Sequence, residues 1–315
     1  MNNGDDEKME NIGFIFPGQG AQKQGMGKSF YDAFETVREV FDTADKVLSD
    51  CSMKSLCFEA DEEELRKTEN TQPSLFTVSY AIYRVLSEKG YSGKVFAGHS
   101  LGEYTAITAS GYIGFEDGLR IVRKRGLLMR DCDPGSEGGM AAVMGLDGDA
   151  IERICSETGD VSPANFNSPG QIVISGKKDK IEQACEKLEA AGAKRTVVLN
   201  VGGPFHSPYM KEAAGELEKE LGAIEWKTGN GTIVSNVNAR MTDDPDKIKK
   251  NLVNQLFNPV LWSLSCQRLV ELGCLRFIEP GPSGILKGLF RRISKEVKVF
   301  SVEEPGNIDK IEITD

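Results

Sequence analysis

The sequence predicts an α/β fold: a large domain with a mainly parallel sheet flanked by helices, plus a smaller ferredoxin-like (βαββαβ) inserted domain. Apolar strands alternate with helical patterns before residue 133 and after residue 202, which is typical of a helix-covered parallel sheet. Between those positions the order becomes strand, helix, two strands, helix, strand, as in the ferredoxin-like unit. We expect an acidic disordered tail at 1–11, an α/β hydrolase-like large domain at 12–132 and 203–304, the insert at 133–202, and a C-terminal tail at 305–315.

The first part of the large domain alternates short apolar strands with longer segments whose apolar residues recur at helical spacing. The expected elements are strands at 12–16 and 94–97 and helices at 29–50, 71–89, 103–109 and 115–130. The first strand ends in Pro17-Gly18-Gln19-Gly20, which indicates a turn.

The insert and the segment after it show the same local signals in a different order. In the insert we expect strands at 139–144, 161–166, 171–175 and 196–199 and helices at 148–158 and 177–191. The turn Asn167-Ser168-Pro169-Gly170 joins the middle two strands into a hairpin. The α/β pattern then resumes with strands at 232–235 and 275–278 and helices at 245–257 and 260–272.

Composition excludes several classes of protein. Hydrophobic residues make up 39% and charged residues 27% of the 315 positions, as in ordinary globular proteins. The net charge of −10 argues against broad nucleic-acid binding, because phosphate contacts need a basic face. No apolar run is long enough to span a membrane, and the polar N-terminus does not fit a signal peptide, so we expect a cytoplasmic location. The seven cysteines lack a C-x-x-C pair and the two histidines lie far apart, so we expect reduced thiols and no metal site.

The stretch Gly98-His99-Ser100-Leu101-Gly102 is a G-x-S-x-G pattern between a predicted strand and a predicted helix. By chance alone such a pattern should occur roughly 0.25 times in this chain, so its structural context carries the inference. In that context it predicts a nucleophile elbow, in which a tight turn exposes the serine at the start of a helix. The free N–H groups of that helix would lie where an oxyanion forms.

A nucleophilic serine needs a base, and the chain has only two histidines. His99 adjoins Ser100, so we expect its side chain to point away from the serine into the protein body. His206 follows Gly203 and Pro204 in a predicted turn, and Ser207-Pro208 after it is a helix-start signal. Without the elbow, a histidine that caps its loop would be the simpler interpretation; with the elbow, His206 is the candidate base.

Arg125 lies on the apolar face of the helix predicted at 115–130. Because an isolated buried charge is very costly, its guanidinium needs an anionic partner. An internal Asp or Glu would serve, but beside a serine–histidine pair a substrate carboxylate is favoured, since the planar fork binds a carboxylate through two hydrogen bonds.

Two basic clusters stand out in this acidic chain. They are residues 120, 123, 124, 125 and 130, and residues 287, 291, 292 and 295. Each is either a solvated helix face or a docking patch for a small acidic partner.

Several motifs together make the chain resemble malonyl-CoA:acyl carrier protein transacylases, the acyltransferases that load malonyl units in fatty-acid and polyketide synthesis. The motifs are Phe16-Pro17-Gly18-Gln19-Gly20, Gly98-His99-Ser100-Leu101-Gly102-Glu103-Tyr104, the hairpin at 162–171, Phe205-His206-Ser207-Pro208 and Gln255-Leu256-Phe257-Asn258-Pro259-Val260. The resemblance runs from about Ile12 to about Glu304.

The resemblance implies a role for each matching position. Ser100 would be the acylated nucleophile and His206 its base, oriented by a backbone carbonyl near Gln255, so that the pair is a dyad. The backbone N–H groups of Gln19 and Leu101 would hold the oxyanion. Arg125 would bind the malonyl carboxylate, and Phe205 would act in acyl selectivity by crowding an α-methyl branch.

The resemblance also implies partners. Malonyl-CoA and the phosphopantetheine of an acidic acyl carrier protein would enter as substrates, with no permanently bound cofactor or metal, and the enzyme would be a monomer. Gly203-Pro204 departs from the family, which commonly has a small or polar residue and alanine there. Selection against methylmalonyl therefore stays open.

Three alternatives remain at this stage. A serine esterase or thioesterase of the α/β-hydrolase class would place its histidine late in the chain, after an acidic triad member, whereas more than a hundred residues follow His206. A module that holds acyl carrier protein without turnover would form no covalent adduct. A discrete polyketide-synthase acyltransferase would share the chemistry and differ in pathway.

Overall fold

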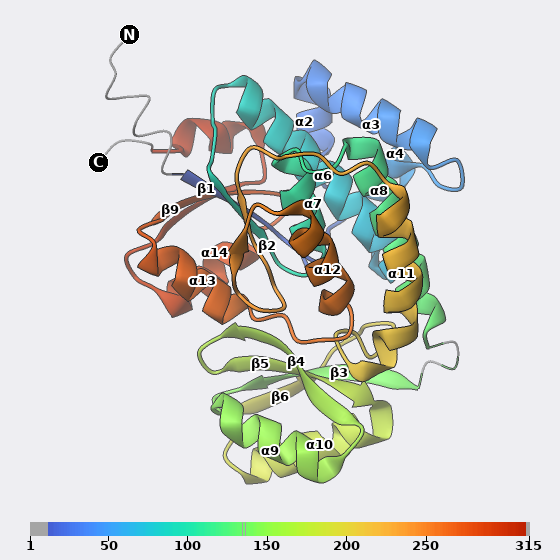
Figure 1. Ribbon diagram of the computed structural model, residues 1–315, viewed down its shortest axis with the longest axis vertical. Helices are drawn as coiled ribbons and strands as arrows, with labels where there is room; N and C mark the ends of the chain where they lie inside the picture. The colour runs from blue at the N-terminus through green and yellow to red at the C-terminus, as the bar shows by residue number, and fades with distance from the viewer. Residues whose placement is uncertain (1–11, 134, 136, 313–315) are drawn as a thin grey trace.

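The computed structural model describes residues 12–133, 135 and 137–312, and the tail expected at 1–11 lies outside them (Figure 1). It confirms the predicted fold class, with a six-stranded sheet in the large domain and a four-stranded sheet in the insert. The larger sheet has the order β10-β9-β1-β2-β7-β8 and is parallel except for the β7–β8 pair. Its strands are β1 (Ile12–Phe16), β2 (Val95–Gly98), β7 (Thr232–Val234), β8 (Met241–Thr242), β9 (Arg276–Pro280) and β10 (Lys298–Val302).

Neighbouring strands β1 and β2 end side by side. Phe16 pairs with Gly98, and the amide of His99 donates to the carbonyl of Phe16 at 3.0 Å. The turn after β1 and the turn after β2 therefore leave the sheet at the same edge. In open parallel sheets this edge, at the carboxyl ends of the strands, is where ligands bind.

Alternate strand residues point to opposite sides of the larger sheet, and apolar side chains lie on both sides. Helices therefore cover both faces. Phe14, Phe16 and Phe96 belong to a core shared with most of the helices, whereas Ile15 packs on the other face with Trp262 and Leu286. The first group of helices is α2 (Lys28–Ala33), α3 (Glu35–Val47), α4 (Met53–Phe58), α5 (Glu62–Arg66), α6 (Thr68–Glu88), α7 (Leu101–Ala109), α8 (Phe115–Asp131), α11 (Lys211–Ala223) and α12 (Pro245–Gln255). The second group is α13 (Trp262–Glu271) and α14 (Ile285–Ile293).

The insert has the predicted order of elements. Its strands are β3 (Gly138–Met144), β4 (Val161–Ser168), β5 (Gln171–Lys177) and β6 (Arg195–Val198), and its helices are α9 (Gly148–Thr158) and α10 (Lys178–Ala190). The antiparallel sheet, β4-β5-β3-β6, packs both helices on one face. Two backbone bonds, Phe166 N to Val260 O and Val260 N to Ala164 O, both 2.9 Å, tie β4 to the large domain. Figure 1 shows the insert as a separate layer at the bottom of the view.

Some boundaries differ from the predictions. The helix expected at 29–50 is two helices, because Phe34 is extended (φ −128°) and stacks its ring on Phe30. The C-terminal tail begins with a 3-10 helix, η2 (Pro305–Lys310), that buries Ile308. In the part of the chain described here, no helix has the length and apolar character needed to cross a membrane.

Candidate active site

Ser100 occupies a strained turn between β2 and α7. Its φ of 51° and ψ of −104° are unusual for a residue with a side chain. The glycines on either side allow the close approach that this turn needs. A Cβ on Gly98 would lie 2.0 Å from the carbonyl of Gly102, and a Cβ on Gly102 would lie 2.0 Å from the oxygen of Phe16.

Asn236, in the loop after β7, holds this elbow from outside. Its Oδ1 accepts from the amide of Ser100 at 2.7 Å, and its Nδ2 donates to the carbonyl of Gly98 at 2.7 Å. Both bonds are buried, so the backbone around the serine has a fixed position.

His206 lies against the serine. Its Nε2 is 2.7 Å from Ser100 Oγ, and its Nδ1 is 2.8 Å from the backbone oxygen of Gln255 at the end of α12. Since a carbonyl can only accept, Nδ1 carries the proton and Nε2 is free to accept one from the serine. Burial, together with the charge of Arg125, lowers the pKa of His206 to about 3, which keeps the imidazole neutral.

Ser207 and Pro208 begin a helical segment, as the sequence indicated, with Ser207 in the N-cap position and Pro208 in the first turn. The Ser207 hydroxyl donates to the carbonyl of Pro204 and does not cap the following helix. A short 3-10 turn, η1 (Pro208–Met210), leads into α11 instead. His206 itself has a φ of 56°, so it shares with Ser100 a positive φ, which is unusual for a residue with a side chain.

Arg125 projects from α8 into the same site and is only 1% exposed. Its Nη1 donates to Gln72 Oε1 at 2.7 Å, and its Nη2 donates to Gln255 Oε1 at 3.0 Å and to Ser100 Oγ at 3.1 Å. Its guanidinium carbon lies 5.2 Å from the centre of the Tyr104 ring.

The hydrogen-bond partners of Arg125 are neutral groups. Among the described residues no carboxylate forms an ion pair with it, and its buried Nε has no hydrogen-bond partner. The alternative of an internal Asp or Glu ion-pair partner is therefore not seen in this part of the chain. A guanidinium whose hydrogen-bond partners are all neutral can receive an anionic ligand.

Gln19 and Leu101 both line the cavity beside Ser100. Leu101 is the first residue of α7, so its amide points out of the helix start. Within the described residues, neither backbone amide has an acceptor assigned to it. The Gln19 side chain is held by Thr68, whose Oγ1 donates to Gln19 Oε1 at 3.0 Å.

A cavity of about 400 Å³ opens between the large domain and the insert and contains these groups. The insert contributes its inner sheet face, and the wall is mainly apolar. The apolar lining residues are Leu101, Met129, Met140, Ala142, Val173, Leu199, Val201, Phe205 and Ile285. Pro204 packs so closely on β3 that a Cβ on Gly138 would lie 2.3 Å from Pro204 Cδ, which fixes the start of the Phe205 loop.

His99 bonds to the insert and not to Ser100 or His206, and it also forms part of the cavity wall. Its Nε2 lies 2.8 Å from Asn167 Oδ1 in the insert, and its ring packs edge-on against Trp262 with centroids 5.6 Å apart. Burial lowers the pKa of His99, so it links the two domains as a neutral group.

Four site residues carried no signal in the sequence. They contact the site through hydrogen bonds and are Thr68, Gln72, Glu103 and Asn236. Three of them lie in segments without a recognised motif, and Glu103 lies inside the motif around Ser100, which gave it no role of its own. All seven cysteines are free thiols, and the described residues contain no group of three or more His, Cys, Asp or Glu side chains suited to a metal ion.

Comparison with known proteins gives one consistent result. Residues 13–303 match the acyl transferase domain. The chain is 42% identical over 305 residues to the malonyl CoA-acyl carrier protein transacylase of Bacillus subtilis (strain 168), covering 96% of both chains. It is 41% identical over 299 residues to the protein of that name from Staphylococcus aureus (strain MRSA252), covering 94% of this chain and 96% of the relative.

Solved structures agree with these relatives. An acyl carrier protein S-malonyltransferase from Vibrio cholerae has a TM-score of 0.93 and 37% identity, covering 96% of this chain and 100% of its own. A malonyl-transacylase in complex with a type II PKS acyl-carrier protein has a TM-score of 0.92 and 39% identity, covering 95% of this chain and 98% of its own.

Proposed function

The chain belongs to the acyl transferase domain family, and from this we propose that it transfers malonyl from malonyl-CoA to the phosphopantetheine thiol of acyl carrier protein. This transfer supplies extender units for fatty-acid biosynthesis. The observation that carries the proposal is the 2.7 Å contact between Ser100 Oγ and His206 Nε2 beside the buried guanidinium of Arg125.

The first half-reaction acylates the serine. Ser100 Oγ attacks the thioester carbonyl of malonyl-CoA while its proton passes to His206 Nε2. The amides of Gln19 and Leu101 stabilise the oxyanion of the tetrahedral intermediate. The C–S bond then breaks, and the coenzyme A thiolate takes the proton from His206 and leaves as the thiol.

The second half-reaction uses the same groups in reverse. The phosphopantetheine thiol gives its proton to His206 and attacks the malonyl-serine ester. The C–O bond breaks, Ser100 regains the proton, and the malonyl thioester of the carrier protein leaves. Both carriers enter as substrates, and neither half-reaction calls for a bound cofactor or metal.

Arg125 binds the malonyl carboxylate in this proposal. Arg125 lines the cavity beside Ser100, and its Nη2 now donates to Ser100 Oγ and Gln255 Oε1. A bound carboxylate would replace one of these neutral acceptors and form charge-assisted hydrogen bonds with the guanidinium. Phe205, 5% exposed in the cavity wall, limits the space for an α-methyl branch.

We further propose that the carrier protein docks on the second basic cluster. Apart from the buried Arg125, the residues of the first cluster already have acidic partners: Arg120 pairs with Glu116, Arg123 with Asp50, Lys124 with Glu220 and Arg130 with Asp131. In the second cluster, Lys287, Arg291 and Lys295 are exposed and form no ion pair with another described residue. A patch of unpaired cations attracts an acidic protein.

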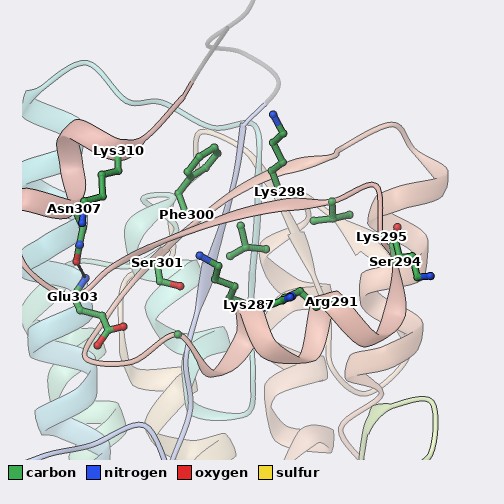
Figure 2. A pocket seen from close by; sticks show the side chains of 13 residues that line it. Lys287, Arg291, Ser294, Lys295, Lys298, Phe300, Ser301, Glu303, Asn307 and Lys310 are labelled. Atoms are coloured by element: carbon green, nitrogen blue, oxygen red, sulfur yellow. Dashed lines mark hydrogen bonds between the residues drawn. The ribbon is translucent and has the colours of Figure 1, made fainter. Parts of the chain in front are cut away.

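The geometry around α14 supports this docking site. Lys287 and Arg291 extend from α14 beside β10 (Figure 2). They line a groove of about 920 Å³ that Lys298 and Lys310 also line, so these two lysines add further positive charge. On the other flank of α14, Ile285 lines the active-site cavity and Arg292 hydrogen-bonds to the cavity residue Gln171. A partner bound along α14 would therefore lie next to the cavity.

We also propose that the protein is a monomer and is located in the cytoplasm.

Intact-mass measurement tests the transfer. After mixing with malonyl-CoA, the protein should gain one malonyl group on Ser100, and the adduct should persist until acyl carrier protein is added. Rapid loss of the adduct in water would indicate a hydrolase, and no adduct would contradict the proposal.

Charge reversal tests the docking site. Lys287→Glu with Arg291→Glu should raise KM for acyl carrier protein several-fold while transfer to free pantetheine stays unchanged. Lys124→Glu, in the first cluster, is the matched control and should leave both unchanged. Equal effects of the two changes would place the carrier protein elsewhere.

A further inference from the structure

Glu103 is a buried carboxylate beside the reaction centre that the mechanism above does not use. It lies in the first turn of α7 and is 0% exposed. Its oxygens accept from Gln255 Nε2 at 2.8 Å, from the amide of Asn236 at 3.1 Å and from Ser235 Oγ at 3.1 Å. Burial raises the pKa of Glu103 to about 7, and these hydrogen bonds oppose the rise. Burying a carboxylate costs free energy, so we expect the contacts that Glu103 makes to be important for the enzyme.

The bond to Glu103 determines which way the Gln255 amide faces. The Nε2 of Gln255 donates to two acceptors, Glu103 Oε2 at 2.8 Å and the carbonyl of Ser100 at 2.9 Å. Its Oε1 therefore faces Arg125 and accepts from Nη2 at 3.0 Å. In the reversed orientation an NH₂ group would face the guanidinium, and two donors would meet.

A second bond links Glu103 to the support of the elbow. The amide of Asn236 donates to the carboxylate, while the side chain of Asn236 holds the backbone of Ser100 and Gly98. One carboxylate thus fixes two chain segments that lie more than 130 residues away from it in the sequence.

We propose that Glu103 is a positioning residue for the malonyl transfer described above, on which this inference rests. Glu103 sets the orientation of the Gln255 amide and the position of Asn236. Through these two residues it places the nucleophile, the base and the carboxylate-binding guanidinium relative to one another. It does not line the cavity and does not touch the substrate.

Two substitutions at this position separate geometry from charge. The assay is single-turnover acylation of the serine by malonyl-CoA and by acetyl-CoA, corrected for the folded fraction by circular dichroism. Glu103→Ala should lower the malonyl rate by about 30-fold or more, since a misplacement of roughly 1 Å can cost about 10²-fold. It should also narrow the preference for malonyl over acetyl, because the guanidinium loses its fixed acceptor.

Glu103→Gln should stay within about 5-fold of the wild-type rate. Its amide oxygen can accept from Gln255 and Asn236, and its NH₂ can donate to the Ser235 hydroxyl. This rescue by an uncharged, isosteric side chain is not expected of a residue that serves only through its charge.

Glu279 provides a matched control. It is also 0% exposed, its pKa is also raised by burial to about 7, and it accepts from the amides of Leu286 and Lys287 and from Ser301 Oγ at 2.9–3.0 Å. Glu279→Ala should lower Tm to a similar extent, with the acylation rate within about 3-fold of wild type.

Two results would overturn the positioning role. One is wild-type acylation per folded molecule in Glu103→Ala; the other is an equal loss of rate in Glu279→Ala. If Glu103→Ala does not fold, Glu103→Asp replaces it, because a carboxylate one methylene shorter cannot reach both Gln255 and Asn236. Malonyl transfer itself is measured separately on the wild-type enzyme, so either result would leave it standing.

Discussion

Replacement of Arg125 by alanine should change which acyl group the enzyme accepts. The guanidinium is 1% exposed and its Nη2 lies 3.1 Å from Ser100 Oγ, so a carboxylate on the bound acyl group comes within its reach. A hydrogen bond to a charged group contributes about 1.5–3 kcal/mol, so two of them contribute about 3–6 kcal/mol. At about 1.4 kcal/mol for each factor of ten, kcat/KM for malonyl-CoA should fall by about 10²–10⁴-fold.

The assay compares malonyl-CoA with acetyl-CoA. An acetyl group has no carboxylate and so makes no such hydrogen bonds to Arg125. The rate of acetyl transfer should therefore rise in Arg125→Ala, because the methyl group no longer lies against a buried cation. Arg120→Ala is the control: Arg120 lies on the same helix but is exposed and pairs with Glu116 at 3.1 Å, and surface ion pairs contribute only about 0–1 kcal/mol. Equal losses for both acyl groups in Arg125→Ala would refute the reasoning and make this arginine a structural residue.

Three further outcomes are expected. Ser100→Ala should form no malonyl adduct by mass spectrometry, and His206→Ala should transfer malonyl at least about 100-fold more slowly than wild type. A malonyl adduct on Ser100→Ala, or normal turnover by His206→Ala, would show that the nucleophile or the base is a different residue. Because the pKa of His206 is lowered to about 3, the base stays deprotonated on acidification. The acylation rate should change by no more than about 5-fold from pH 8 to about pH 5, the range that loss of the Glu103 charge near pH 7 allows; a roughly tenfold fall for each pH unit below 6.5 would contradict this. Gly102→Ala, whose Cβ would lie 2.0 Å from Phe16 O, should lose more than about 3 kcal/mol of stability by thermal denaturation, whereas Gly215→Ala, in an open helical position, should gain about 0.5–1 kcal/mol.

The sequence carried strong signals for part of the site. The G-x-S-x-G stretch marks its own turn, because the glycines and the serine are neighbours in the chain. His206 could be selected because the chain holds only two histidines. Gln19 and the Gln255 carbonyl were assigned through the family resemblance, since a backbone group leaves no mark of its own on residue identity.

The remaining contacts had no local signal. Asn236, Gln72 and Glu103 act through hydrogen bonds to residues 53–152 positions away in the chain. Helices α4 and α5 have only six and five residues, too few to show a helical period, so neither could be predicted from the sequence. The break at Phe34 was also missed, because the apolar spacing continues across it.

The large domain and the insert each form one side of the cavity. Every group assigned to bond making belongs to the six-stranded-sheet domain, while Met140, Ala142 and Val173 of the insert close the opposite side. The length of the acyl group that fits can therefore change through substitutions in this one small sheet, whereas Phe205 and Arg125, proposed above to act on the branch and the carboxylate, lie in the large domain. The reactive half can stay as it is, so new extender units become available without rebuilding the chemistry.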